Sequence, residues 1–320
     1  KILVVGGAKD EIAHKSAEVY DPSDDTWILT SSMMMTRGLH TATLIDDGRV
    51  MVIGGRGNEE LGMIEVEFFH PVERTWIEGP ELFRSRVGHT ATLLQNGNLL
   101  VVGGGAPDYE IFDPVQDKWI ERGPIEQNRR DHTATLLQNG MVLVTGGGET
   151  DNTAEIYDTQ THKWNPSGEL IEGRATHTAT LLKDGRVLVA GGSDYVGSKS
   201  HAEIYDPDTG RWMRSDTVTY WQTTSEMNIP RSDHTATLLD SGDVLIVGGR
   251  TRLETDAIGQ IGEVGFVSKS EIYSIEKREW ILGAEVNEAR AGHVAISTND
   301  RVFIFGGIAT ILTDELDPRG

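Results

Sequence analysis

The feature that most constrains the fold of this chain is a block of sequence that returns every 43 to 58 residues. Two copies are nearly identical, "RVGHTATLLQNGNLLVVGGG" at 86–105 and "RRDHTATLLQNGMVLVTGGG" at 129–148. Each full copy has an Arg-x-x-His, an apolar run closed by Gly-Gly, a Glu-apolar-aromatic triplet, and a Trp nine residues after that Glu. Self-similarity at a period of about 20–50 residues indicates a repeat architecture.

The copies differ in completeness at the two ends of the chain. The Gly-Gly pair occurs seven times, whereas the Arg-x-x-His, the Glu and the Trp occur six times each. Residues 1–36 lack the Arg-x-x-His half of the block, and residues 290–320 carry it with only a degraded "DELDP" after it. We therefore expect one domain over 1–320 with incomplete repeats at both ends, as part of a longer chain.

Each block predicts four strands. "HTATLL" alternates between two faces, as a half-buried strand does, and Asn96-Gly97 then predicts a tight hairpin turn. The apolar run before Gly-Gly predicts a second strand, the Glu triplet a third, and the Trp segment a fourth. No long segment shows a 3.6-residue period, so the fold class is all-β. Four-stranded antiparallel units repeated at this spacing predict the blades of a β-propeller.

The recurrence of Arg-x-x-His, Gly-Gly, Glu-Ile-Tyr-Asp and Trp resembles the kelch repeat over nearly the whole chain. The sequence of the repeat resembles bacterial kelch proteins more than the animal adaptor proteins. The resemblance implies a kelch-type β-propeller of four-stranded antiparallel blades, for which we expect seven blades and keep six as the alternative. It also relates the chain to the kelch propeller of galactose oxidase-like proteins, whose copper site needs a tyrosine–cysteine crosslink. This chain has no cysteine, so that chemistry is not expected.

Composition narrows the classes of partner. The formal net charge is −21, and such a field repels nucleic acid phosphates. No apolar run approaches the roughly 20 residues that span a bilayer, so no membrane insertion is expected. A chain without cysteine suits a reducing cytosol or a bacterial exported protein, and we favour an extracellular or cell-surface place on a microbe over the cytoplasm.

Loop lengths indicate which parts of the repeat are free to vary. Only the loops after strands two and four vary in length, and these emerge on one face because strands alternate in direction. The two longest are 213–229 and 250–270. They predict a rim of aromatic and arginine side chains suited to a partner. The candidate residues there are Arg214, Tyr220, Trp221, Arg250 and Arg252, with Tyr195 in a neighbouring loop.

The recurrent polar residues have a structural and a functional interpretation. Each arginine of Arg-x-x-His should pair with the Glu of its own third strand, and by resemblance to kelch adaptor proteins the set could also grip a partner at the channel mouth. The set is Arg37, Arg86, Arg129, Arg174, Arg231 and Arg290. The repeated histidines predict packing between blades, not a metal ring. Turns such as "DPDTGRW" leave calcium as a minor alternative.

These observations favour a non-catalytic binding or scaffold module that presents one loop face to a protein or peptide, with a glycan as a further option. No cofactor and no metal ligand set is expected. Two alternatives stay open: a mutarotase-like, carbohydrate-active kelch enzyme with its site at the channel mouth, and a structural subunit of a larger assembly. The sequence contains no non-repeating set of acid, base and nucleophile, which favours the non-catalytic interpretation.

Overall fold

The computed structural model describes residues 1–9, 12–59, 61–148, 151–214, 226–252, 264–298 and 301–308. Those residues form antiparallel β-sheets, and no helix occurs among them. The chain divides into two compact units, Lys1–Ala175 with Tyr205–Trp212, and Thr176–Ile204 with Met213–Gly320. The all-β prediction is confirmed for the described residues.

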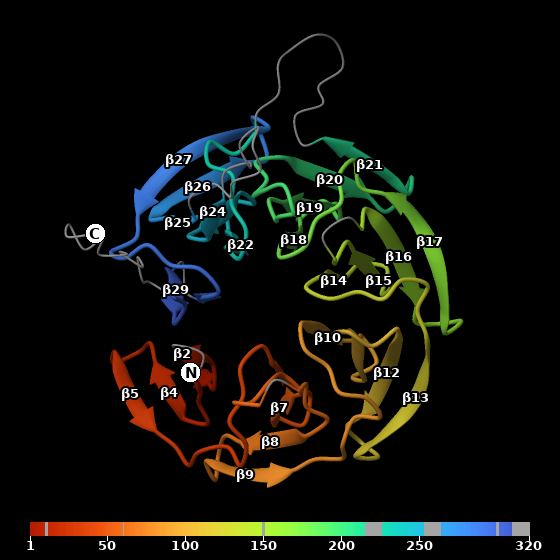
Figure 1. Cartoon of the computed structure of the whole chain (residues 1–320), viewed down its shortest axis with the longest axis vertical. Coiled ribbons are helices and arrows are strands. Elements are labelled where there is room, and N and C mark those ends of the chain that lie inside the picture. Colours follow the sequence, from red (N-terminus) through yellow and green to blue (C-terminus); the bar gives the residue numbers. More distant parts are fainter. Residues whose placement is uncertain are drawn as a thin grey trace, which may run out of the picture. The chain divides into compact units, whose positions relative to one another are not determined.

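The first unit holds three complete four-stranded sheets, each made of strands in chain order (Figure 1). The first has β6 (Thr41–Leu44), β7 (Val50–Ile53), β8 (Val66–His70) and β9 (Thr75–Glu78). The second has β10 (His89–Leu93), β11 (Leu99–Gly103), β12 (Asp108–Asp113) and β13 (Lys118–Pro124). The third has β14 (Thr133–Leu136), β15 (Val142–Thr145), β16 (Thr153–Asp158) and β17 (Lys163–Glu169). Strand β10 contacts both β6 and β14, so the first strands of successive sheets are neighbours, as in a propeller.

The first unit also contains the incomplete N-terminal sheet. Its strands are β1 (Ile2–Val5), β4 (Ala17–Asp21) and β5 (Thr26–Leu29). A small ribbon, β2 (Ala8–Lys9) and β3 (Ile12–Ala13), extends from the loop between β1 and β4. The sheet matches the expectation that this end supplies the second, third and fourth strands without a first.

The second unit contains one complete sheet and two smaller elements. The sheet has β22 (Thr235–Leu238), β23 (Val244–Val247), β26 (Lys269–Ser274) and β27 (Glu279–Glu285). The smaller elements are the ribbon β24 (Arg250–Arg252) with β25 (Val264–Phe266), and the hairpin β28 (Val294–Thr298) with β29 (Arg301–Phe305). One further sheet divides between the units and has the order β18 (Thr178–Leu181), β19 (Val187–Ala190), β20 (Ala202–Asp206) and β21 (Arg211–Arg214).

The expectation of seven blades is wrong, and the alternative of six fits the described sheets. Five sheets have four strands and one has three. Residues 290–308 form only the hairpin β28–β29, and a third and fourth strand for it do not occur among the described residues. A hairpin alone buries too little apolar surface to stand as a blade. The "DELDP" segment proposed as its third strand lies outside the described residues.

The core lies between neighbouring sheets and is built from the second strands. Leu99, Leu100, Val101 and Val102 of β11 are each 0% exposed. Their alternate side chains enter two different clusters, with Leu99 and Val101 in one and Leu100 and Val102 in the other. A strand buried on both faces reads as a continuous apolar run, which is why this part of the repeat does not alternate.

Three of the repeated tryptophans join their sheet to the one before it by a hydrogen bond. The indole Nε1–H of Trp119 in β13 donates to the carbonyl of Pro80 at 2.8 Å, just beyond the last strand of the preceding sheet. Trp76 makes the same bond to Ser31 at 2.8 Å, and Trp212 makes it to Ser167 at 3.0 Å. The Trp is therefore a packing and hydrogen-bonding residue of the scaffold, as its constant spacing predicted.

Candidate functional site

The variable loops lie together on one side of each sheet. The linker that leaves β9 runs beside the loop that follows β7, with Leu82 N donating to Ile64 O at 2.8 Å and Arg86 N to Met63 O at 3.2 Å. In the second unit Val286 N donates to Ser268 O at 2.8 Å in the same way. The loops after strands two and four thus form one continuous loop face on each sheet, and we use that name below.

The repeated arginines lie beneath this face, inside the sheets. Arg86 donates from Nη1 to the carbonyl of Gly103 at 2.7 Å, and from Nη2 to Glu110 at 2.9 Å and Asp108 at 2.6 Å. Glu110 is the acid of the third strand in the same sheet. The same ion pair joins Arg37 to Glu67 and Arg231 to Glu271, each at 2.7 Å. The predicted arginine–glutamate pairing is confirmed at these sheets.

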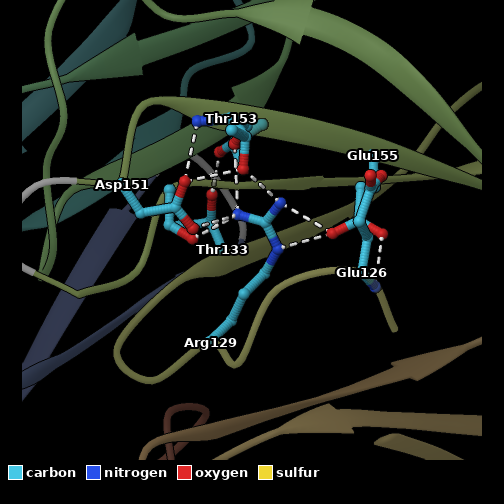
Figure 2. Close-up of polar contacts among 8 residues, drawn as sticks. Glu126, Arg129, Thr133, Asp151, Thr153 and Glu155 are labelled. Atoms are coloured by element: carbon cyan, nitrogen blue, oxygen red, sulfur yellow. Dashed lines mark hydrogen bonds and ion pairs between the residues drawn. The ribbon is translucent and has the colours of Figure 1, made fainter. Parts of the chain in front are cut away.

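Arg129 donates from all three nitrogens of its guanidinium. Its Nε donates to Glu155 at 3.0 Å, and its Nη2 to Glu155 and to Thr153 Oγ1, each at 2.7 Å. Its Nη1 donates to Asp151 at 2.9 Å and to two backbone carbonyls. Figure 2 shows the guanidinium enclosed between Asp151 and Thr153 on one side and Glu155 on the other. Every edge of this fork has a protein acceptor, so it binds the scaffold instead of an external anion.

Burial separates the six arginines into two groups. Arg37, Arg86, Arg129, Arg174 and Arg231 are each 0% exposed. Arg290, which precedes the hairpin β28–β29, is 21% exposed at its side chain, and its ion pair is a 3.3 Å contact with the nearby Glu288. Because no described third strand stands beside that hairpin, Arg290 has no equivalent of Glu110.

The glutamates also fix the linkers. The Glu67 carboxylate accepts from the backbone N–H of Met34 at 2.6 Å, Glu110 from that of Phe83 at 2.9 Å, and Glu271 from that of Asn228 at 2.6 Å. Each ion pair therefore anchors the chain that crosses onto the sheet. The recurrent arginines and glutamates therefore fix the position of the linkers that form part of the loop face.

The repeated histidines join neighbouring sheets. Thr41 Oγ1 lies 2.9 Å from His89 Nε2, and Thr90 Oγ1 lies 2.9 Å from His132 Nε2. In the second unit His234 and His293 make the same contact with threonines of the preceding sheet. Burial, reinforced by the adjacent arginine, lowers the pKa of His89 and His132 to about 3, which keeps both rings neutral. The prediction of packing between blades is confirmed for these histidines.

The predicted rim residues are only partly within the described structure. Tyr220 and Trp221 lie outside the described residues, as does the side chain of Arg214. Tyr195 is 58% exposed in the loop 191–201. That loop lies beside β24, since Ser198 N donates to Arg252 O at 3.0 Å and Arg252 N to Ser198 Oγ at 2.9 Å. The structure thus brings the Tyr195 loop next to the strand that carries Arg250 and Arg252.

Arg250 and Arg252 differ in what their side chains contact. Arg250 Nε pairs with Asp233 at 2.7 Å, and the Arg250 side chain is 51% exposed. The Nε of Arg252 is buried and has no hydrogen-bond partner within the described part of the chain. Of this pair, Arg250 is the more exposed residue beside the Tyr195 loop.

A second group on the loop face was missed by the sequence analysis. Phe83 is 59% exposed and lies between two arginines, with Arg122 Cζ 3.5 Å and Arg84 Cζ 5.8 Å from its ring centroid. Other apolar side chains are exposed on linkers and loops of the same unit, namely Met34, Met35, Leu39 and Leu61. A signal existed in the sequence, because Phe83 is the only aromatic residue at its repeat position, but Arg122 lies 39 residues away and only the fold places it there.

Neither a metal site nor a membrane-spanning helix is found in the ranges that the structure describes. No group of three or more His, Asp or Glu side chains is arranged there to hold an ion. No helix long and apolar enough to cross a bilayer occurs in those ranges either.

Comparison with known proteins identifies the architecture. Residues 40–249 match the model described as the KLHDC2/KLHL20/DRC7 Kelch-repeats domain, and residues 1–34 match the Kelch motif. No curated protein matches the chain. The two matches cover most of the chain and agree with its repeated four-stranded sheets. The chain belongs to the kelch-repeat β-propeller family.

Proposed function

We propose that this chain is a non-catalytic binding module that presents its loop face to a protein or peptide partner. The kelch propeller is commonly a protein-interaction module. The observation that carries the proposal is the exposure of large apolar and aromatic side chains on variable loops, above recurrent arginines that are buried in five of six repeats. Exposed apolar surface of this kind is typical of interaction sites.

The scaffold supports this assignment because it buries most of the repeated arginines, which are then not accessible to a partner. Five of the six repeated arginines are 0% exposed, and the arginines with described contacts bind carboxylates and carbonyls of their own sheets. A partner that approaches the loop face therefore meets the side chains that vary between repeats. These include Tyr195, Arg250, Phe83 and the linker methionines, and we extend the same role to Arg214, Tyr220 and Trp221.

The opposite side of the sheets supplies a matched control. Its tight turns carry Val72 and Val115, which are 88% and 93% exposed, so apolar exposure alone exists on both sides. The test is affinity capture of partners by the full chain, followed by quantitative binding of the captured protein to two variants. One variant is Phe83→Ser with Tyr195→Ser, and the other is Val72→Ser with Val115→Ser.

We expect the loop-face variant to lose at least about tenfold in affinity, since aromatic side chains are common anchors of interfaces. The turn variant should bind as the parent chain does. The proposal fails if the turn variant loses binding and the loop-face variant retains it, or if the chain turns over a substrate that the loop-face variant processes equally well.

A further inference from the structure

We propose that Phe83, Arg84 and Arg122 form a binding site for an acidic segment of a partner protein. An apolar side chain of that segment would pack on Phe83, and its carboxylates would accept hydrogen bonds from the two guanidiniums. This inference rests on the proposed function and names the place and the chemistry of the contact. We refer to the three residues as the Phe83 site.

The stacking at the Phe83 site leaves the cationic edges available. Arg122 Cζ lies 3.5 Å from the centroid of the Phe83 ring, and Phe83 is 59% exposed. A guanidinium stacked flat on a ring keeps its charge and its in-plane N–H donors. Those donors match the geometry of a carboxylate, which a guanidinium can bind with two parallel hydrogen bonds.

The site is held by the buried framework below it. Leu82 is 3% exposed, and the next backbone N–H, that of Phe83, donates to Glu110 at 2.9 Å. Glu110 is in turn paired with Arg86 at 2.9 Å inside the sheet. The ring is therefore mounted on a fixed backbone, which reduces the entropy lost when a partner binds.

The charges around the site are not balanced internally. Asp108 is shared, because it pairs with Arg84 at 3.0 Å and with the buried Arg86 at 2.6 Å. Glu121 precedes Arg122 in β13, but successive strand residues face opposite sides, and Glu121 accepts from Tyr109 at 2.7 Å. Arg122 has no ion pair within the described ranges of the chain. The site is a cationic spot, so an anionic group complements it.

The overall charge of −21 repels an acidic ligand, whereas Arg84 and Arg122 attract it. The distance over which each force acts decides which of the two is larger at the Phe83 site. At physiological ionic strength the Debye length is about 8 Å, so charges elsewhere on the chain are largely screened. Arg84 and Arg122 act at contact distance, where charge-assisted hydrogen bonds form. The attraction is then short-range, and binding should weaken as salt increases.

The Phe83 site does not belong to the repeated scaffold. In five of the six linkers a buried apolar residue comes before the position that Phe83 takes, and in the sixth the preceding residue is the half-buried Val286. The residues at this position in the other linkers are Met34, Glu126, Ile171, Asn228 and Asn287. None of these is aromatic. A residue that the repeat does not require, exposed and flanked by arginines, is explained by an interaction and not by the packing of its own sheet.

The experiment selects ligands without knowledge of the partner. A library of random peptides is panned against the full chain, and enriched peptides are measured by fluorescence anisotropy. We expect enrichment of peptides that combine Asp or Glu with a large apolar residue. Phe83→Ser and Arg122→Gln should each weaken their binding by about tenfold or more. Arg84→Gln should weaken it less, because Asp108 already engages Arg84.

The matched control is Arg130→Gln. Arg130 is also an exposed linker arginine, 52% exposed at its side chain, but no aromatic ring in the described part of the chain makes a cation–π contact with it. It should leave peptide affinity unchanged. Since none of the four changed side chains is buried, thermal melting should confirm that every variant folds as the parent does.

Several outcomes would overturn the Phe83 site. Enrichment of basic or neutral peptides would do so, as would a preference for phosphorylated peptides or oligonucleotides over carboxylate peptides. Equal binding to Phe83→Ser and to the parent chain would also reject it. If acidic peptides bind, but only substitutions at Tyr195 or Arg250 weaken their binding, the Phe83 site fails and the proposed function stands. If changes on the loop face affect neither peptides nor captured partners, both fail.

Discussion

The recurrent arginine shows how a charged residue can be a core residue. Arg86 is 0% exposed, and its two terminal nitrogens donate to two carboxylates and two carbonyls. Removing a single partner from such a buried pair leaves a charge that neither water nor protein neutralises. The energetic role of the residue therefore depends on its surroundings more than on its type.

The same substitution should therefore lower the stability by different amounts at two repeat positions. Arg86→Gln should lower the free energy of unfolding by about 3–5 kcal/mol, because Glu110 would stay buried without its counter-charge. Arg290→Gln should cost less than about 1 kcal/mol, as expected for an exposed pair. Urea denaturation of both variants against the parent measures the difference. Equal losses would contradict the role given to the third-strand glutamate.

The second glycine of the repeated pair, Gly104, and the glycine that follows the pair, Gly105, give a second contrast at the residue scale. Gly104 has a φ of +84°, and an added Cβ would lie 2.7 Å from His89 Cβ. Gly105 has a φ of +86° with no atom within 4 Å of the same added carbon. Both alanine variants incur the left-handed strain of about 1–2 kcal/mol, and only Gly104→Ala adds a clash with the first strand.

We therefore expect Gly104→Ala to lower the melting temperature well beyond the effect of Gly105→Ala. Circular dichroism melts of the two variants give the comparison. If both melting temperatures fall by the same amount, the conformation of the backbone alone explains the glycine at position 104, and close approach to His89 does not.

Residue-level patterns let the sequence predict the scaffold well. The Arg–Glu pairing, the packing role of the histidines and the tight turns all follow from side chains that recur at fixed spacing. The Phe83 site could not be predicted, because Arg122 meets Phe83 only after β13 is placed beside the linker. A contact between a strand and a linker of different repeats has no signature in local spacing.

At the scale of elements, adjacent sheets are joined by neutral histidines. Four of them contact a threonine hydroxyl of the preceding sheet through Nε2, for example at 2.9 Å for His132 and 3.0 Å for His234. Burial, with the nearby arginine, lowers the pKa of both rings to about 3. An unfolded imidazole has a pKa near 6.5, so the unfolded chain binds a proton at pH values where the folded chain does not.

Acid should therefore unfold the protein through these contacts. Their contribution to stability is complete above about pH 6.5 and is lost as the pH falls from there towards 3. Each such histidine should contribute a slope of about 1 kcal/mol per pH unit across that window. Urea titrations at several pH values between 7 and 4 would measure it.

His132→Gln supplies the control, because glutamine does not titrate. The variant should be less stable than the parent at pH 7 and should show a shallower dependence on pH. An unchanged slope would mean that other groups, such as the buried carboxylates, determine the acid sensitivity.

Sheet topology was easier to predict than the number of sheets. The order of strands within each block follows from turns of fixed length, and the three-stranded start follows from the missing Arg-x-x-His. The seven Gly-Gly pairs suggested seven blades, but a Gly-Gly strand end does not ensure that strands three and four follow. Residues 290–308 have the first half of the pattern, and the hairpin β28–β29 is what that half forms.

At the scale of the whole molecule, the loop face concentrates the variation that a binding module needs. The insertion at 213–229 carries Tyr220 and Trp221, adjacent aromatics that no repeat requires. We predict that Trp221→Ala weakens binding of a captured partner by about tenfold and leaves the melting temperature unchanged. Isothermal titration with the partner and a thermal melt test the two halves. Unfolding of the variant would assign Trp221 to a core instead.

The bonds between sheets have a consequence for how such a chain can be rearranged. The carbonyl of each repeat arginine accepts from the second glycine of the sheet before it, at 2.9 Å for Arg86 with Gly55 and 2.7 Å for Arg129 with Gly104. Together with the threonine–histidine contact, these junctions use atoms that the four-stranded repeats share. One repeat could then be grafted in place of another, cut from arginine to arginine, and would bring its own loops with it. We therefore expect that repeats can be exchanged, which would change the side chains on the loop face while the hydrogen bonds between sheets stay the same.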